Sequence, residues 1–444
     1  MDYRALYREK IRTPEEAVKL VKDGDWVDYS QTCSFPQALD RALAARSGEL
    51  RDVKIRNAIS MLPVATVEND PGHSFTYNLW HCSGLDRKYI DQGRAYHTPM
   101  LFRHCGSYYR KGYAPVDVAM VTVAPMDEQG YFSFGLTNCA MQELLEAAKT
   151  IIVEVNPTMP VTRGIESGRI HIQDVDGIVE CDQPVPTVSS PLASELDRKI
   201  AAHILPFITS GATLQLGIGG IPNAIGTLIA ESDVKDLGMH TELMSDGYLD
   251  LYRAGKITNR YKKLDTGKGI FSICNGSREL YDFLDHNEEV LTAPMRYVNS
   301  PETIRQLDDF VSINGCIAVD LYGQVSSESS GTRQISGTGG QLDFITGALE
   351  AEHGRAFLTM HATFTDKTGK VHSRILPKFT AGDIITTPRT QAPSIVTEYG
   401  IAQLPGKATW QRAEALIEIA HPDFREELIR AAEEQKIWRR SNKR

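Results

Sequence analysis

A glutamate and two glycine-rich turns are the groups in this chain whose types and spacing could do chemistry. Glu242 lies in the run Thr-Glu-Leu-Met-Ser-Asp-Gly at 241–247, shortly after the turn Gly-Ile-Gly-Gly-Ile-Pro-Asn at 217–223. A second glycine turn, with Gly-Thr-Gly-Gly at its centre, spans 336–344. Glycine lets the main chain approach a ligand, and a strand-to-helix turn can direct N–H groups at an oxyanion or phosphate. This layout favours acyl chemistry on a large phosphorylated carrier.

Neither turn is a dinucleotide-binding fingerprint. The third glycine of a GxGxxG pattern is replaced by Pro222 in the first turn and by Leu342 in the second, and a Walker A lysine is absent. Taken alone, each turn is more often an ordinary strand-to-helix connection than a binding site. Glu242 alone is also weak, because most of the 57 acidic residues must solvate the surface. A carboxylate in a partly desolvated cleft, however, can attack a thioester if N–H groups stabilise the oxyanion.

Bulk composition indicates an ordinary globular protein with two domains. The chain has 444 residues, 41% hydrophobic and 24% charged, and a formal net charge of -9, which gives no general attraction to nucleic acid or to a membrane surface. No apolar run is long enough to span a membrane. Seven scattered cysteines without a CxxC pair predict reduced thiols in the cytoplasm. The twelve histidines stand singly, so the sequence supports no metal site and no redox cofactor.

The order of predicted elements indicates an internal duplication of an open α/β domain. A strand at 26–29, a turn and a helix at 37–45 recur as a strand at 211–216, a turn and a helix at 223–231, and helices are predicted at 13–22 and 195–208 before these strands. We call this repeated order the first echo. A second echo pairs the strand, turn and strand predicted at 116–134 with those predicted at 317–326. The proline-rich segment 181–191 predicts a boundary, so we expect an N-terminal domain at 1–188 and a C-terminal domain at 189–444 that carries Glu242. Helices at 408–420 and 423–433 should cover the second domain.

Together the motifs resemble the acetyl-CoA hydrolase/transferase family of class I CoA-transferases, over essentially the whole chain. The nearest branch is that of 4-hydroxybutyrate and butyryl-CoA:acetate CoA-transferases. The residues that carry the resemblance are four ordered segments, at 217–223, 240–247, 297–302 and 337–344, supported by 26–29, 376–379 and 387–389.

The resemblance implies two similar α/β domains with the active site at their interface, and it implies roles for particular residues. Glu242 would be the catalytic glutamate, forming a glutamyl-CoA thioester. The turn residues Gly217, Ile218, Gly219, Gly220 and Ile221, with Asn299, would serve the oxyanion and CoA. Gly337, Gly339, Gly340 and Lys378 would contact CoA, and Gln31 would face the acyl pocket, although a solvated lysine explains Lys378 equally well.

The implied activity is transfer of CoA between a short-chain acyl-CoA and a carboxylate such as acetate, in short-chain fatty acid metabolism. The acyl group could be butyryl, 4-hydroxybutyryl, propionyl or acetyl. The only cofactor implied is coenzyme A as co-substrate, and a homodimer or dimer of dimers is expected. Two other functions stay open: an acyl-CoA hydrolase, in which water intercepts the same acyl-enzyme, and a non-catalytic sensor of acyl-CoA or sugar phosphates.

Overall fold

The computed structural model describes residues 2–189 and 191–439. Contacts group them into two compact units. Unit 1 comprises Met1–Ser189, His240–Asp246 and Lys268–Ser300, and unit 2 comprises Ser190–Met239, Gly247–Gly267 and Pro301–Arg444. Unit 1 therefore includes the segments that carry Glu242 and Asn299. The predicted division into a domain at 1–188 and a domain at 189–444 stays a prediction.

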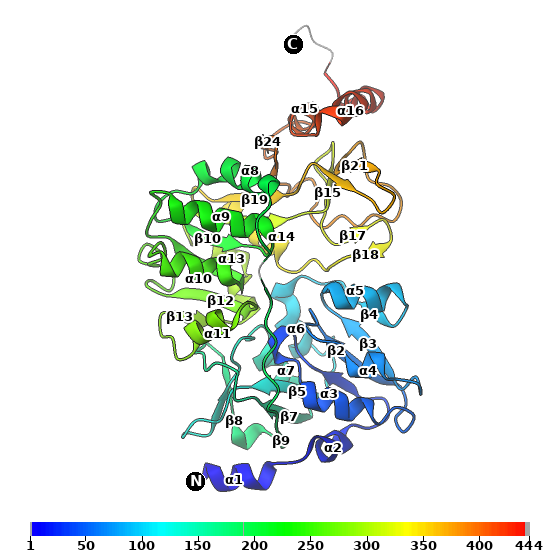
Figure 1. Ribbon diagram of the computed structural model, residues 1–444, viewed down its shortest axis with the longest axis vertical. Helices are drawn as coiled ribbons and strands as arrows, with labels where there is room; N and C mark the ends of the chain where they lie inside the picture. Colours follow the sequence, from blue (N-terminus) through cyan, green and yellow to red (C-terminus); the bar gives the residue numbers. More distant parts are fainter. Residues whose placement is uncertain (1, 190, 440–444) are drawn as a thin grey trace. The chain divides into compact units, whose positions relative to one another are not determined.

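Unit 1 contains a parallel sheet in the order β4-β3-β2-β1-β5-β7-β9. Its strands are β1 (Trp26–Asp28), β2 (Val53–Asn57), β3 (Phe75–Leu79), β4 (Ala95–His97), β5 (Val118–Val123), β7 (Thr150–Val155) and β9 (Gly177–Glu180), and β6 (Tyr131–Ser133) pairs with β8 (Arg169–His171) apart from it. The helices are α1 (Tyr3–Lys10), α2 (Pro14–Ala17), α3 (Gln37–Ala44), α4 (Ala65–Glu68), α5 (Gly84–Asp91), α6 (Cys105–Arg110) and α7 (Met141–Ala147) (Figure 1). Two further strands, β12 (Gly269–Cys274) and β13 (Val290–Thr292), and two helices, α11 (Arg278–Leu284) and α12 (Met295–Val298), complete the unit.

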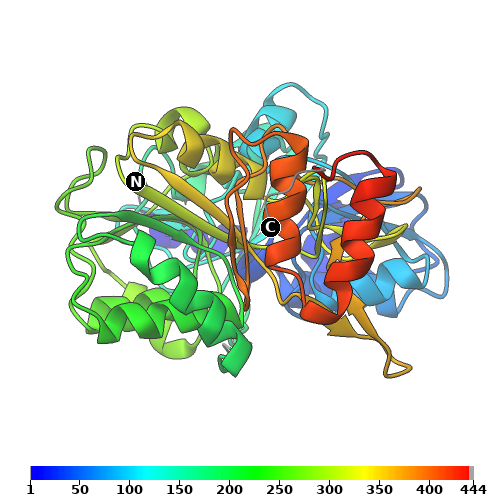
Figure 2. The same ribbon diagram turned by 90° about the horizontal axis from the view of Figure 1, so that it is seen from above.

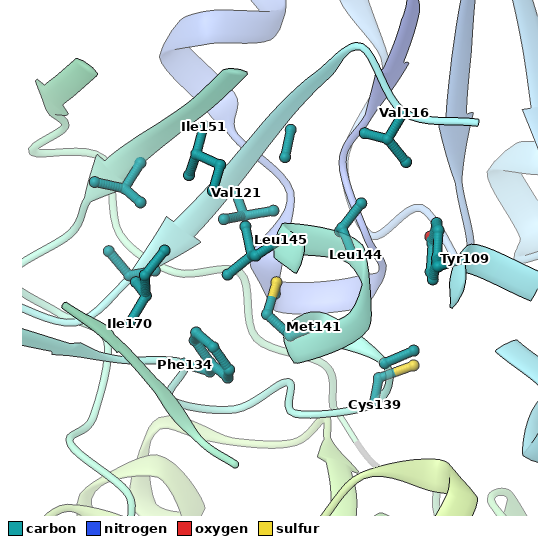
Figure 3. Packing of buried hydrophobic residues seen from close by; sticks show 14 of the residues in the cluster. Tyr109, Val116, Val121, Phe134, Cys139, Met141, Leu144, Leu145, Ile151 and Ile170 are labelled. Carbon is teal, nitrogen blue, oxygen red and sulfur yellow. The ribbon is translucent and has the colours of Figure 1, made fainter. Parts of the chain in front are cut away.

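The sequence of strand β5 is almost continuously apolar because both faces of the strand are buried. Val118 and Met120 face one buried cluster with α3 and α5, whereas Ala119, Val121 and Val123 face the other. Figure 3 shows this second cluster, in which side chains of α6 and α7 pack against β5. Because both faces are covered by helices, each residue of the strand is buried.

Local sequence signals set several helix starts correctly. Thr13 and Glu16 form a reciprocal capping box before α2, and Pro14 occupies the first helical position. The predicted helix at 13–22 is shorter than expected, because α2 gives way to a 3-10 turn at Val18–Leu20. Ser194 and Asp197 form an equivalent box before α8 (Glu195–Ile204).

Unit 2 contains β10 (Thr213–Leu216), β14 (Phe310–Gly315), β19 (Arg355–Thr359), β23 (Ser394–Thr397) and β24 (Gly400–Ala402), with short hairpins outside that sheet. The remaining strands are β15 (Ala318–Asp320), β16 (Val325–Ser326), β17 (Ser329–Ser330), β18 (Arg333–Gln334), β20 (Thr363–Thr365), β21 (Val371–Ser373) and β22 (Ile375–Leu376). Its helices are α8, α9 (Gly220–Glu231), α13 (Pro301–Ile304), α14 (Gln341–Glu350), α15 (Thr409–Glu418) and α16 (Pro422–Glu434). The grouping divides two elements, β11 (Gly238–Met244) and α10 (Asp246–Arg253).

The strand orders support the predicted duplication. The second large sheet has the order β13-β12-β11-β10-β14-β19-β23-β24, so β10 takes the place of β1 and β14 takes the place of β5. The first predicted echo is therefore confirmed. The second is confirmed in its turn, where Asp127 and Asp320 each accept two backbone N–H groups, and in its hairpin, where Ala124 N–H donates to Ser133 and Ile317 N–H donates to Ser326. It is wrong only in its first strand. The counterpart of β5 is β14, at 310–315, whereas the segment at 317–326 forms a small antiparallel hairpin of β15 and β16. Both segments are short buried apolar runs, and periodicity alone does not distinguish them.

The chain ends in the two helices that the sequence predicts. Figure 2 shows α15 in orange and α16 in red as neighbours. Leu416 and Ala413 of α15 are fully buried. In the parts of the chain that the structure describes, no helix combines the length and the apolar composition that a membrane crossing requires.

Candidate active site

Glu242 lies in β11, on a strand whose register with its neighbour is well defined. Thr241 pairs with Phe271 and Leu243 with Ile273, which places Ser272 of β12 beside Glu242. Glu242 is only partly buried, although Thr241 and Met244 around it are fully buried. A carboxylate is thus held on a rigid strand with part of its surface open.

Asn299 is the first predicted site residue that the structure brings to Glu242. Its Nδ2 donates a hydrogen bond to Glu242 Oε2 at 2.5 Å, and the residue is 0% exposed. His240 Nε2 donates to the carbonyl of Val298 at 2.8 Å. His240 and Glu242 are two positions apart in the strand, so their side chains lie on the same face. Two successive residues on that face hold the C-terminal end of α12, and this fixes the Asn299 amide against the carboxylate.

Gln31 lies in the turn that follows β1, where the backbone takes rare conformations. Ser30 and Thr32 have φ values of 58° and 50°, in the left-handed region that non-glycine residues seldom occupy. Gln31 is 2% exposed, and its Nε2 donates to Cys139 Sγ. Its Oε1 is buried without a hydrogen-bond partner among the described residues. Such departures from ordinary backbone and pairing are typical of functional sites.

The loop at 137–139 joins this turn to the strands around Glu242. The hydroxyl groups of Thr32 and Thr137 are 2.9 Å apart. Thr137 bridges to Ile273, and the Asn138 N–H donates to the Ser272 carbonyl at 2.9 Å, so the loop adds to the edge of β12 next to Glu242. The sequence analysis did not identify this loop, because nothing in its composition marks a contact with a strand so distant in the chain.

The first glycine turn, in unit 2, begins helix α9. Gly219 is the N-cap of that helix with φ 119°, a conformation that requires glycine, and Ile218 is 69% exposed. Gly220 is required for a different reason. A Cβ there would lie 2.4 Å from Asp197 Oδ2. The expectation that this segment is a strand-to-helix turn is confirmed, with the helix starting at Gly220 and not at Asn223.

Asp197 is held firmly where it meets Gly220. Its carboxylate accepts hydrogen bonds from Ser194 N and Oγ, at 2.8 and 2.7 Å, and from His361 Nε2 at 2.8 Å. Burial disfavours the charged form, but these bonds outweigh it and lower the pKa of Asp197. The fixed carboxylate of Asp197 therefore packs directly against the main chain of the turn at Gly220.

The second glycine turn, also in unit 2, leads into α14. Gly339 has φ 56°, Gly340 is the N-cap, and Thr338 Oγ1 donates to Glu328 Oε1 at 3.2 Å. Gly337, Gly339 and Gly340 are all buried. Lys378 follows β22 and is exposed.

The described contacts therefore link three of the predicted residues within unit 1: Glu242 and Asn299 directly, and Gln31 through Cys139. The two glycine turns and Lys378 belong to unit 2. The roles of all these residues in CoA and oxyanion binding stay predictions.

The other acid of the motif, Asp246, makes a contact that holds a loop. Asp246 accepts bonds from Ser277, from Oγ at 2.5 Å and from N at 3.1 Å, and so fixes the loop that follows β12. This contact explains the aspartate of the Ser-Asp-Gly element as a structural requirement. Glu242 instead contacts the Asn299 amide at a partly open position.

The chain belongs to the acetyl-CoA hydrolase/transferase family, as the sequence predicts. It matches the acetyl-CoA hydrolase/transferase N-terminal domain over residues 1–189 and the acetyl-CoA hydrolase/transferase C-terminal domain over residues 276–432.

Full-length relatives and a solved structure agree with this family. A butyryl-CoA:acetate CoA-transferase of Anaerostipes caccae is 48% identical over 447 residues, covering 100% of both chains. A probable butyrate:acetyl-CoA coenzyme A-transferase of Syntrophomonas wolfei is 46% identical, covering 98% of both. The crystal structure of RipA from Yersinia pestis has a TM-score of 0.91 and 34% identity over 98% of this chain and 100% of its own, which confirms the predicted α/β fold.

Proposed function

We propose that this enzyme transfers CoA between a short-chain acyl-CoA and acetate by a ping-pong reaction with Glu242 as the nucleophile. The observation that carries the proposal is the partly open carboxylate of Glu242 on a rigid strand, held by the Asn299 amide at 2.5 Å. The names of the 48% and 46% identical relatives support the choice of reaction. We place this reaction in cytoplasmic short-chain fatty acid metabolism.

The chemistry proceeds through two acyl exchanges on one carboxylate. Glu242 attacks the thioester carbonyl, the C–S bond breaks, and an acyl-glutamyl anhydride and a CoA thiolate form. The thiolate then attacks the glutamyl carbonyl, which releases the donor carboxylate and leaves a glutamyl-CoA thioester. Acetate reverses both steps and leaves as acetyl-CoA, restoring the Glu242 carboxylate. The thioester energy is conserved throughout, and coenzyme A enters as a co-substrate.

Asn299, the two glycine turns and Lys378 also have parts in this proposal. Asn299 orients Glu242. Its amide can also donate to the oxygen of the glutamyl carbonyl when that oxygen develops negative charge. The N–H groups at Gly219, Gly220 and Ile221 supply the oxyanion and CoA contacts, and the turn at Gly337–Gly340 with Lys378 contacts the CoA nucleotide. Binding energy from that remote nucleotide can then be used to place the sulfur for attack.

Hydrolysis is the second candidate function, because water could intercept the same acyl-enzyme. A Schizosaccharomyces pombe relative named acetyl-CoA hydrolase is 27% identical, well below the 48% and 46% of the two transferases described above. The two activities differ in what acetate does. Acetate discharges the CoA adduct productively in a transferase, whereas it leaves the rate of CoA release by a hydrolase unchanged.

The deciding experiment is the intact mass of the wild-type protein after incubation with butyryl-CoA and no acceptor, followed by peptide mapping. We expect a CoA adduct on the peptide that contains Glu242, and its loss when acetate is added. Glu242→Gln should abolish the adduct and reduce transfer by several orders of magnitude while folding is preserved. Steady release of free CoA without an adduct would instead establish the hydrolase. The absence of both an adduct and CoA release would indicate a binding protein.

A further inference from the structure

Cys139 is a buried cysteine at the centre of the contacts that surround Glu242. It is 2% exposed and lies at the margin of the core cluster, just before α7 (Figure 3). Its thiol accepts a hydrogen bond from the Gln31 side chain and lies 3.3 Å from Met295 Sδ. A small apolar side chain would fill this volume without making either polar contact.

Met295 connects Cys139 to Asn299, which contacts Glu242. The Met295 N–H donates to the Cys139 carbonyl at 2.7 Å, and the Asn299 N–H donates to the Met295 carbonyl at 2.8 Å. Residues four apart in a helix share a face, so Met295 and Asn299 point to the same side of α12. Gln31, Cys139, Met295 and Asn299 therefore form a continuous series of contacts that ends at Glu242.

The backbone of Cys139 is itself held in an unfavourable conformation. Its φ is 43°, in the left-handed region, and its N–H donates to the carbonyl of Ser272, the residue beside Glu242. Strain of this kind persists only where surrounding contacts determine it, and it is concentrated at functional sites. A cysteine with ordinary core packing would need none of these features.

We propose that Cys139 is a positioning residue for the transfer reaction. Its thiol ties the Gln31 turn to helix α12 and so sets where the Asn299 amide meets Glu242. This inference rests on the proposed function, because it assigns Cys139 a part in placing the proposed nucleophile. The same contacts hold the Gln31 side chain, which the family resemblance assigns to the acyl pocket, so the proposal extends to acyl-chain preference.

The test compares Cys139→Ala with Cys105→Ala in the full-length enzyme. Cys105 is a fully buried cysteine of the same core cluster and lies outside the series of contacts from Gln31 to Asn299, so its variant reports the loss of a buried thiol elsewhere in this core. We expect both to melt at similarly reduced temperatures. Only Cys139→Ala should form the Glu242 adduct roughly 10- to 100-fold more slowly, because misplacement of a reacting group by about 1 Å costs about 100-fold. The KM for acyl-CoA should change little, and the ratio of rates with propionyl-CoA and butyryl-CoA should shift.

A second variant keeps the test decisive if Cys139→Ala folds poorly. Met295→Leu conserves volume and removes the sulfur, so it should fold normally and slow adduct formation in the same direction. Wild-type rates and an unchanged chain-length ratio in both variants would overturn the inference. Absence of any CoA adduct on wild-type Glu242 would overturn the proposed function instead, so the two failures are distinct.

Discussion

At the scale of residues, the functional distinction lies between two acids four positions apart. Asp246 is engaged by Ser277 and holds a loop, whereas Glu242 meets the Asn299 amide at a partly open position. The Asn299 amide restrains the carboxylate of the proposed nucleophile. A hydrogen bond to a charged group contributes about 1.5 to 3 kcal/mol, which is enough to matter for the orientation of Glu242.

We predict that Asn299→Ala lowers kcat for CoA transfer roughly 10- to 100-fold, with a smaller effect on KM. Loss of the donor frees the Glu242 carboxylate and removes one group that could stabilise the oxyanion. Asn299→Asp should be more damaging, because it keeps the size of the side chain and places a second carboxylate beside the first. Steady-state kinetics at saturating acyl-CoA measure both, and an unaltered kcat in either variant would contradict the role.

At the scale of elements, a strand-to-helix turn is built against a neighbouring carboxylate. Gly219 supplies a backbone conformation, and Gly220 supplies room for Asp197, which Ser194 and His361 hold in place. The capping box that starts α8 therefore also shapes the start of α9. Any effect of a Gly220 variant on chemistry includes this structural contribution.

We predict that Gly220→Ala lowers the free energy of unfolding by roughly 1 to 3 kcal/mol, because the new Cβ displaces a fixed carboxylate. Gly226→Ala is the matched control in the same helix. Its Cβ would meet the Gly247 carbonyl at an ordinary 3.5 Å, so helix propensity should leave stability unchanged or about 1 kcal/mol higher. Thermal melts compare the two.

Combining Gly220→Ala with Asp197→Ala should restore part of the loss. The two changes act on one contact, so their effects should not add. Strictly additive losses would show that Asp197 is not the reason for this glycine.

At the scale of the whole molecule, a buried lysine makes stability depend on pH. Lys262 is 3% exposed, and its Nζ donates to the Met239 carbonyl at 3.0 Å. Burial lowers the pKa of Lys262 to about 7, against a smaller opposing effect of Asp265. Above that pH the folded protein holds a neutral amine while the unfolded chain still binds the proton, so stability rises with pH from about 7 towards the pKa of an exposed lysine. Below pH 7 the full cost of a buried charge is present.

We therefore predict that Lys262→Met raises the melting temperature on the order of 5 °C at pH 6, and that the gap narrows to about 2 °C or less at pH 9. The control is Lys263→Met, which removes an exposed lysine paired with Asp308 and should show no such pH dependence. Differential scanning calorimetry across this range measures both. A gap that widens with pH would contradict the predicted direction.

The sequence by itself determined the features that depend on neighbours in the chain. Capping residues such as Thr13 and Ser194, the βα turns, the duplicated order of the first strands and the motif around Glu242 all follow from local pattern. The second echo failed in its first strand only, because a buried parallel strand and a buried hairpin strand have the same composition.

Only the tertiary structure decided which residues that are distant in the sequence contact one another. It placed Asn299 on Glu242, Asp197 behind Gly220, and Cys139 between Gln31 and Met295. No local signal marks Cys139 or Lys262, because their importance comes from burial and from partners that are distant in the sequence. Periodicity records which face of an element is apolar, whereas side-chain contacts depend on how the elements pack.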